Sequence, residues 1–143
     1  MASCPPITRG PAATPASALL RAQRHDCDCL AVGVVDLSTG TLLDSSSVDP
    51  RLDEHLAMAT VELIAGENMS ALRHTLGTPG RNAAHPEREL VVTTDDRVYM
   101  FLRSVHRSDV VLVTAYRRLA NIGKTLARAR HALSSIDQAL WVE

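Results

Sequence analysis

The sequence has few aromatic residues and no excess of either charge, and both shortages exclude classes of function. Phe, Tyr and Trp make up 3% of the 143 residues, which is too few to build the stacking platforms that bind nucleic-acid bases. The formal net charge of −1 also lacks the positive footprint of proteins that bind nucleic acids or anionic membranes. We therefore expect no nucleic-acid partner and no direct insertion into a membrane.

Cysteines are scarce, and the chain begins without a long apolar run. The three cysteines are an odd number, and Cys27 and Cys29 lie too close together for a useful disulfide, which indicates a reducing compartment. Residues 1–18 lack the continuous apolar segment of a secretory signal or membrane span. We expect a cytoplasmic protein with a flexible Pro/Ala-rich tail at 1–15 and a single domain at 16–143.

Short apolar runs predict five strands. Residues 30–35 and 110–115 are apolar throughout, so both are expected to be central strands covered on two faces. A turn ending in Gly40 joins the first of these to a second strand, and a turn at Asp95 and Asp96 joins the next two. The remaining predicted strands are 41–46, 90–94 and 97–103.

Helical periodicity predicts a short helix at 16–24 and a long, continuous one at 51–77. The long helix carries two apolar stripes on nearly opposite sides. The first, expected to face the protein's own core, comprises Leu52, Leu56, Ala59, Leu63 and Gly66; the second comprises Met58, Val61, Ala65, Met69, Leu72 and Leu76. The second stripe needs another cover, so we expect this helix to lie between the sheet and a second copy of itself.

The last helix has the most regular pattern of the chain. Its apolar residues are separated by alternating steps of three and four, which fits either a coiled-coil seam or a helix packed along a sheet. We favour the packed helix. The residues concerned are Leu119, Ile122, Leu126, Ala129, Leu133, Ile136 and Leu140.

The order of elements and two short motifs resemble the Roadblock/LC7 family of profilin-like α/β domains. One motif is the hairpin at 32–43, with a small apolar run, Asp36, the turn glycine Gly40 and a second apolar run. The other is Ala-Asn-Ile-Gly at 120–123, followed by Leu-Ala-Arg at 126–128, at the start of the last helix. Neither motif is catalytic.

The resemblance implies an α+β fold of order α-β-β-α-β-β-β-α, with a five-stranded antiparallel sheet and helices on both faces. It also implies homodimerisation through the second helix and the third strand, and regulation of, or scaffolding for, Ras-like small GTPases. Carried onto this chain, the implied dimer interface comprises Met58, Val61, Ala65, Met69, Leu72, Leu90, Val91, Val92 and Thr93.

Two local patterns suggest other chemistry, and we favour neither. His25, Cys27 and Cys29 alternate as zinc ligands could, but no second Cys/His cluster follows at the spacing of a zinc finger. Gly123-Lys124-Thr125 matches the end of a phosphate-binding loop, but Arg118 occupies the position of the required glycine. We therefore predict no metal, no cofactor and no catalytic residue.

The leading functional hypothesis is a non-enzymatic homodimeric module that binds a protein partner, most often a small GTPase in this family. The alternative is a small-molecule sensor domain of related architecture, because fold alone does not determine function. A sensor would need a cavity lined by Tyr99, Phe101 and their neighbours, with a few converging polar groups. A closed core beside an exposed second helix would favour the module.

Overall fold

A computed structural model describes residues 28–49, 51–76, 88–118 and 121–141 of the chain. The predicted tail, the first helix at 16–24 and most of the loop after the long helix lie outside these residues. No helix in the described ranges is long and apolar enough to cross a membrane. The elements are β1 (Cys29–Asp36), β2 (Thr41–Ser47), α2 (Arg51–Ala65), α3 (Glu67–Leu76), β3 (Glu89–Thr93), β4 (Arg97–Arg103), β5 (Val110–Arg117) and α4 (Ile122–Trp141).

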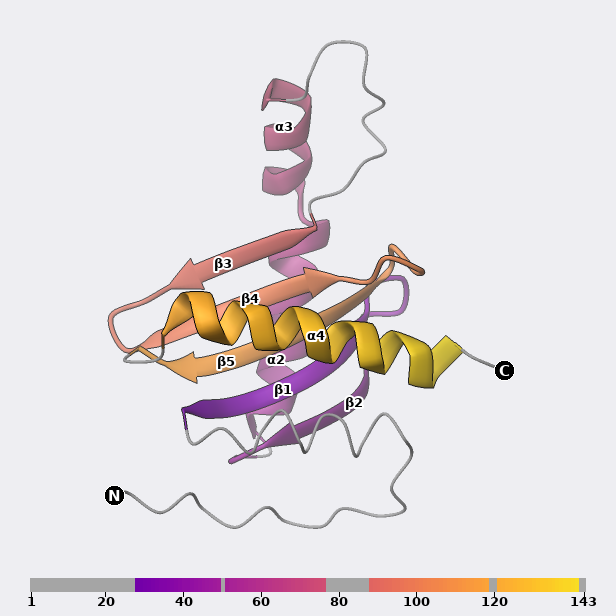
Figure 1. The fold of residues 1–143 in the computed structure, drawn as a ribbon. Coiled ribbons are helices and arrows are strands. Elements are labelled where there is room, and N and C mark those ends of the chain that lie inside the picture. The colour runs from indigo at the N-terminus through magenta and orange to yellow at the C-terminus, as the bar shows by residue number, and fades with distance from the viewer. Residues whose placement is uncertain (1–27, 50, 77–87, 119–120, 142–143) are drawn as a thin grey trace.

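The five strands form one antiparallel sheet in the order β2-β1-β5-β4-β3 (Figure 1). The runs at 30–35 and 110–115 lie in β1 and β5, which are interior strands buried along most of their length, so both predictions are confirmed. The β1–β2 turn depends on Gly40, whose φ of 69° favours glycine. Asp36 stabilises this turn by accepting hydrogen bonds from the backbone N–H and the hydroxyl of Ser38.

Each face of the sheet is covered by a helix. α4 runs across one face, and α2 crosses behind the other (Figure 1). The alternation of side chains along each strand separates two apolar clusters, because neighbouring residues point to opposite faces. The α4-side cluster includes Val32, Met100 and Leu112, and the α2-side cluster includes Val35, Phe101 and Val113.

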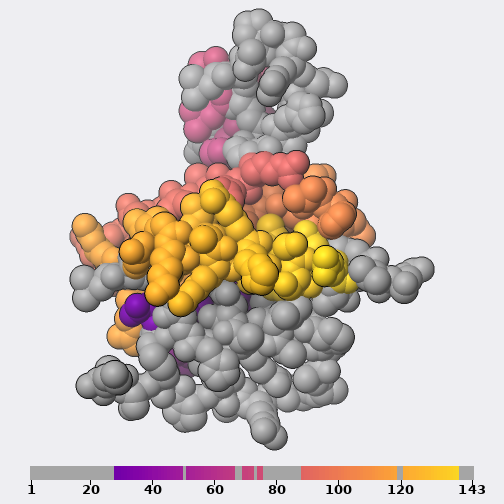
Figure 2. Space-filling view, in the orientation of Figure 1, coloured from indigo at the N-terminus to yellow at the C-terminus, as the bar shows by residue number. Residues whose placement is uncertain are grey.

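The prediction of one continuous helix at 51–77 is wrong, because the chain bends at Gly66 and forms two helices. A Cβ at this position would lie 2.1 Å from the backbone oxygen of Glu62, so only glycine fits the observed bend. The apolar pattern includes Gly66 as a small residue of the core-facing stripe and so does not predict a bend there. α3 then extends beyond β3, past the edge of the sheet (Figures 1 and 2).

The core-facing stripe of α2 also differs from the prediction. Leu56 is buried as expected, but Leu63 is exposed, and Ile64 and Thr60 are buried. Thr60 tolerates burial because its hydroxyl donates a 2.6 Å hydrogen bond to the backbone oxygen of Leu56. A pattern of apolar residues alone cannot detect a buried threonine of this kind. The predicted stripe was therefore right at Leu52 and Leu56, which contact the core, and wrong at Leu63.

α4 is a helix packed along the sheet, as predicted. Ala129, Leu133 and Ile136 are buried in the α4-side cluster. Asn121 caps the helix, since its side-chain oxygen accepts a hydrogen bond from the backbone N–H of Lys124. Leu119 and the side chain of Leu140 lie outside the described positions.

Two buried threonines differ in how their hydroxyls are satisfied, which gives a test of the core. Thr114 lies in β5 with no exposed surface, and its Oγ1 has no hydrogen-bond partner among the described residues. We expect Thr114→Val to stabilise the fold by about 1 kcal/mol, because it removes an unpaired polar group at nearly constant volume. Denaturant unfolding followed by circular dichroism measures the difference.

The matched control is Thr60→Val, which removes a hydroxyl that does have a partner. We expect no stabilisation there, and at most a loss of about 1 kcal/mol. An equal loss of stability in both variants would contradict this description of Thr114.

Candidate functional site

β3 is an edge strand whose outer side is open. It pairs with β4, and in the described part of the chain no strand pairs with its other side. Such an edge presents unpaired backbone N–H and C=O groups that a further strand can use. Leu90 and Val92 lie half-buried against the α2-side cluster, whereas Val91 pairs with Met100, points to the α4 face and is exposed.

The outer face of α2 and α3 is apolar and exposed. Met58 has 63% of its surface accessible and Leu72 has 49%. Ala65 is also exposed, and Val61 and Met69 are half-buried. Leu63 is also exposed, although the sequence pattern assigned it to the core, but it lies on a different side of α2 from Met58 and Val61. Among the described residues, the main tertiary contacts of α3 are with α2, so its apolar side chains have little cover from the other described elements.

The nine predicted interface residues therefore fall into three groups. Five lie on the α2 and α3 helices, and two, Leu90 and Val92, lie on the same face of the sheet as α2. Val91 and Thr93 point to the opposite face, since their strand partners Met100 and Val98 belong to the α4-side cluster. The structure thus places five of the nine residues on the α2 side of the sheet, and Met69 and Leu72 on α3, beyond the sheet edge.

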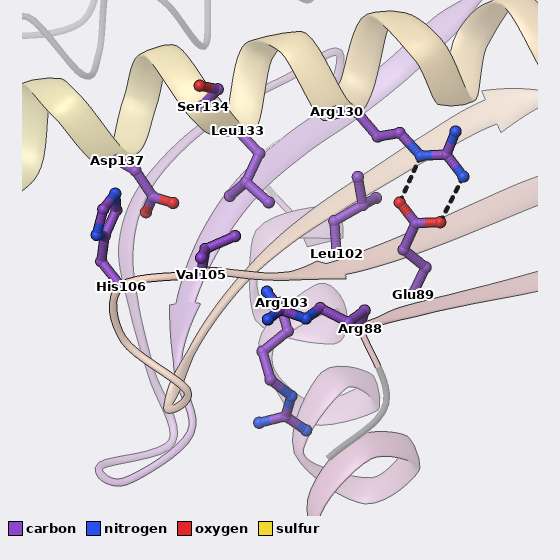
Figure 3. Close-up of a pocket in the computed structure, with 10 residues that line it drawn as sticks. All are labelled: Arg88, Glu89, Leu102, Arg103, Val105, His106, Arg130, Leu133, Ser134 and Asp137. Atoms are coloured by element: carbon purple, nitrogen blue, oxygen red, sulfur yellow. Dashed lines mark hydrogen bonds and ion pairs between the residues drawn. The ribbon is translucent and has the colours of Figure 1, made fainter. Parts of the chain in front are cut away.

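An ion pair joins the edge strand to α4, and sequence reasoning did not find it. Both guanidinium nitrogens Nε and Nη2 of Arg130 donate 2.6 Å hydrogen bonds to the carboxylate of Glu89 (Figure 3). These hydrogen bonds lower the pKa of the Glu89 carboxyl below its ordinary value. The partners are 41 residues apart, so no local pattern relates them.

The described residues of the candidate zinc site and of the phosphate-loop-like segment make ordinary structural contacts. Cys29 is buried in the α4-side cluster with its thiol 3.6 Å from the backbone oxygen of Ala31, while His25 and Cys27 lie outside the described residues. Within the described ranges, no three His, Cys, Asp or Glu side chains gather as a metal site would need. The Thr125 hydroxyl bonds to the backbone oxygens of Asn121 and Ile122, and Lys124 is exposed.

Tyr99 and Phe101 are not among the residues that line a pocket on the α4 side of the sheet. Phe101 is buried in the α2-side cluster, and Tyr99 packs half-buried against it. The pocket, of about 300 Å³, lies between α4, the end of β4 and the β4–β5 loop (Figure 3). Its lining includes Leu102, Val105 and Leu133 together with several charged side chains.

The fold described above matches solved structures, although no protein-family model and no curated protein sequence matches the chain. MglB of Myxococcus xanthus aligns with a TM-score of 0.71 at 19% identity over 88% of this chain and 87% of that one. The gliding protein MglB of Thermus thermophilus also gives 0.71, at 15% identity over 96% and 97%. A Roadblock/LC7 domain from Streptomyces avermitilis gives 0.65, at 14% identity over 87% and 96%.

The chain therefore has the Roadblock/LC7 fold, and the fold predicted from the resemblance is confirmed. The sheet is antiparallel and five-stranded, with the second and last helices on opposite faces. Another of the matched structures, at 16% identity and a TM-score of 0.70, is described as MglB with a tetrameric arrangement.

The Glu89–Arg130 pair predicts a pH-dependent contribution to stability. Because the folded-state pKa of Glu89 is lowered, the pair stabilises the fold above the unfolded pKa near 4.5, and this stabilisation is lost as the pH falls through the folded-state pKa. We expect Glu89→Gln to be less stable than wild type at pH 7, and the difference to disappear at strongly acidic pH. Urea unfolding at a series of pH values measures both. A difference independent of pH would contradict an electrostatic origin.

Proposed function

We propose that this protein is a non-enzymatic homodimeric module that binds a protein partner through its surfaces. The main support for this proposal is the exposed apolar face of α2 and α3. α2 lies on the same side of the sheet as Leu90 and Val92 of the open β3 edge. Several exposed apolar side chains gathered on one surface are typical of a protein–protein interaction site. A second copy related by a two-fold axis would pair β3 with β3 and cover both helix faces at once.

The proposed partner is a Ras-like small GTPase or a complex that contains one. The resemblance to the Roadblock/LC7 family and the likeness of fold to MglB support this part of the proposal. The chain would regulate or scaffold the GTPase without supplying catalytic residues of its own, in the cytoplasm.

The sensor alternative has less support. Tyr99 and Phe101, the aromatic side chains expected to line its cavity, pack in the α2-side cluster. The exposed outer face of α2 is the feature that we expected of the interaction module.

Charges placed on the apolar face should separate the dimer. We expect wild type to sediment as a dimer, and Met58→Glu with Leu72→Glu to sediment as a folded monomer, because both side chains are exposed in one protomer and buried in the proposed interface. The expected loss is about 3 kcal/mol or more of dimer stability, or roughly a hundredfold in dissociation constant. Analytical ultracentrifugation measures it.

The matched control is Ile122→Glu, which replaces another exposed apolar side chain at the start of α4. It should leave the dimer intact, whereas Val91→Lys should weaken it by adding charge to the pairing edge. A monomeric wild type, or a double variant with the mass of a dimer, would contradict the proposed interface.

The partner is tested separately. A purified small GTPase encoded beside this chain's gene should bind the wild-type protein, and its affinity should differ between the GTP-loaded and GDP-loaded forms. Isothermal titration calorimetry with both forms measures the affinities. Absence of binding to either form, with an intact dimer, would reject this GTPase as partner and leave the dimer standing.

A further inference from the structure

The two outer strands of the described sheet differ in how their open sides are protected. The pairing of β2 with β1 skips Leu43, which forms a bulge, and β2 also presents Asp44 and three consecutive serines. β3 pairs with β4 in an unbroken register and contains neither proline nor lysine. Because bulges, prolines and charged residues keep an edge strand from pairing with another chain, β3 is the less protected of the two described edges.

The single charged residue of β3 is compensated within its own protomer. The carboxylate of Glu89 accepts two 2.6 Å hydrogen bonds from Arg130 on α4. The other residues of the strand, 90–93, are uncharged. An approaching strand therefore meets no uncompensated charge along β3.

The hydrogen bonds between β3 and β4 define which backbone groups face the open side. The N–H of Arg103 donates to the backbone oxygen of Arg88, and the N–H of Thr94 donates to that of Arg97. Hydrogen-bonded and non-hydrogen-bonded residues alternate along an antiparallel pair. Residues at even positions therefore use their backbone groups on β4, and those at odd positions direct theirs outward. The strand residues with outward backbone groups are Glu89, Val91 and Thr93.

The outward groups favour one centre for pairing with a second copy. A two-fold axis pairs each residue with one at the same distance on the other side of the axis. With the axis at Val91, all three outward residues form hydrogen-bonded pairs: Val91 with Val91, and Glu89 with Thr93 in both directions. Moving the axis by one residue in either direction loses one of these three pairs, and moving it by two residues loses two.

The side chains favour the same centre. With the axis at the middle of β3, Leu90 lies opposite Val92 of the second copy, so apolar side chains pair on the α2 side. An axis at Leu90 would instead place the charged Arg88 opposite that valine. An axis at Val92 would place Glu89 opposite Asp95 of the second copy, and like charges directly opposite one another are destabilising.

We propose that β3 pairs antiparallel with β3 of a second copy in one register, with the two-fold axis at Val91. This inference rests on the proposed homodimer and adds which residues meet in it. Glu89 then lies opposite Thr93 of the second copy, and Leu90 and Val92 of both copies form one apolar row across the axis on the α2 side. The edge is selective for a second copy, because another strand would have to match both its outward groups and its side chains.

Disulfide cross-linking tests the register directly. In the proposed register, Leu90 and Val92 of the second copy form a non-hydrogen-bonded pair, whose Cα atoms lie roughly 4.5 Å apart and can carry a disulfide. Leu90→Cys and Val92→Cys chains, co-expressed with different affinity tags and purified by both, should therefore cross-link on mild oxidation. Either variant alone should not, because identical positions then lie roughly 7–8 Å apart on the diagonal. Peptide mapping by mass spectrometry identifies the joined residues.

The matched control is Leu43→Cys, which alters an exposed residue of the bulged edge β2. Co-expressed with Val92→Cys, it should give no cross-link. A cross-link formed by Leu90→Cys alone or by Val92→Cys alone would overturn the proposed register in favour of one centred on that residue.

Two lysine substitutions test the register without cysteine. Val91 and Thr93 are both exposed and point to the α4 side. Val91→Lys would place two ammonium groups opposite each other at the axis, whereas Thr93→Lys would place one opposite Glu89 of the second copy. We expect Val91→Lys to raise the dimer dissociation constant at least about tenfold more than Thr93→Lys, measured by sedimentation equilibrium at low salt. Equal effects of the two substitutions would overturn the register.

Failure of the register and failure of the proposed function give different results. A wild-type protein that sediments as a dimer, but whose Leu90→Cys and Val92→Cys chains do not cross-link, would reject the register and leave the dimer standing. A monomeric wild type would reject the dimer itself.

Discussion

The structure depends on the apolar character of β5 and β1 on both of their faces. A strand buried on two sides needs a cover on each, and one helix cannot supply both. α2 and α4 are these covers, and the alternation along the strands assigns each apolar side chain to one of them. β3 lies two strands from β5, at the edge of the sheet, where Leu90, Val92 and Val91 are only partly covered. The candidate interface is thus centred on the edge strand, where the described part of the chain covers the sheet least.

The strands and the last helix could be predicted from the sequence because their signals are local. Continuous apolar runs marked β1 and β5, and steps of three and four marked the buried face of α4. The errors occurred where one residue type has two uses. Gly66 fits an apolar stripe because it is small, but in the structure it forms a bend in which a Cβ atom would clash with the backbone oxygen of Glu62. Thr60 is polar, yet it can be buried because its hydroxyl donates a hydrogen bond to a backbone oxygen of its own helix.

The candidate site was predictable to a similar extent. The outer residues of α2 and α3 follow from helical periodicity, and the role of β3 came from the resemblance to a family. The ion pair of Glu89 with Arg130 and the bond of Ser104 with Asp137 join residues 41 and 33 positions apart. Such pairs are set by how α4 lies across the sheet, and no spacing along the chain indicates them.

The bend at Gly66 also bears on how proteins of this shape can diverge. Among the described elements, α3 packs mainly against α2, and none of its residues belongs to the two apolar clusters. Substitutions at its exposed positions should therefore have little effect on the stability of the fold. Its amino acids can therefore drift, or be redesigned, while the sheet and its two covering helices keep their packing. If α3 forms part of the proposed interface, residues 67–76 are a segment in which recognition can change with little effect on the stability of the fold.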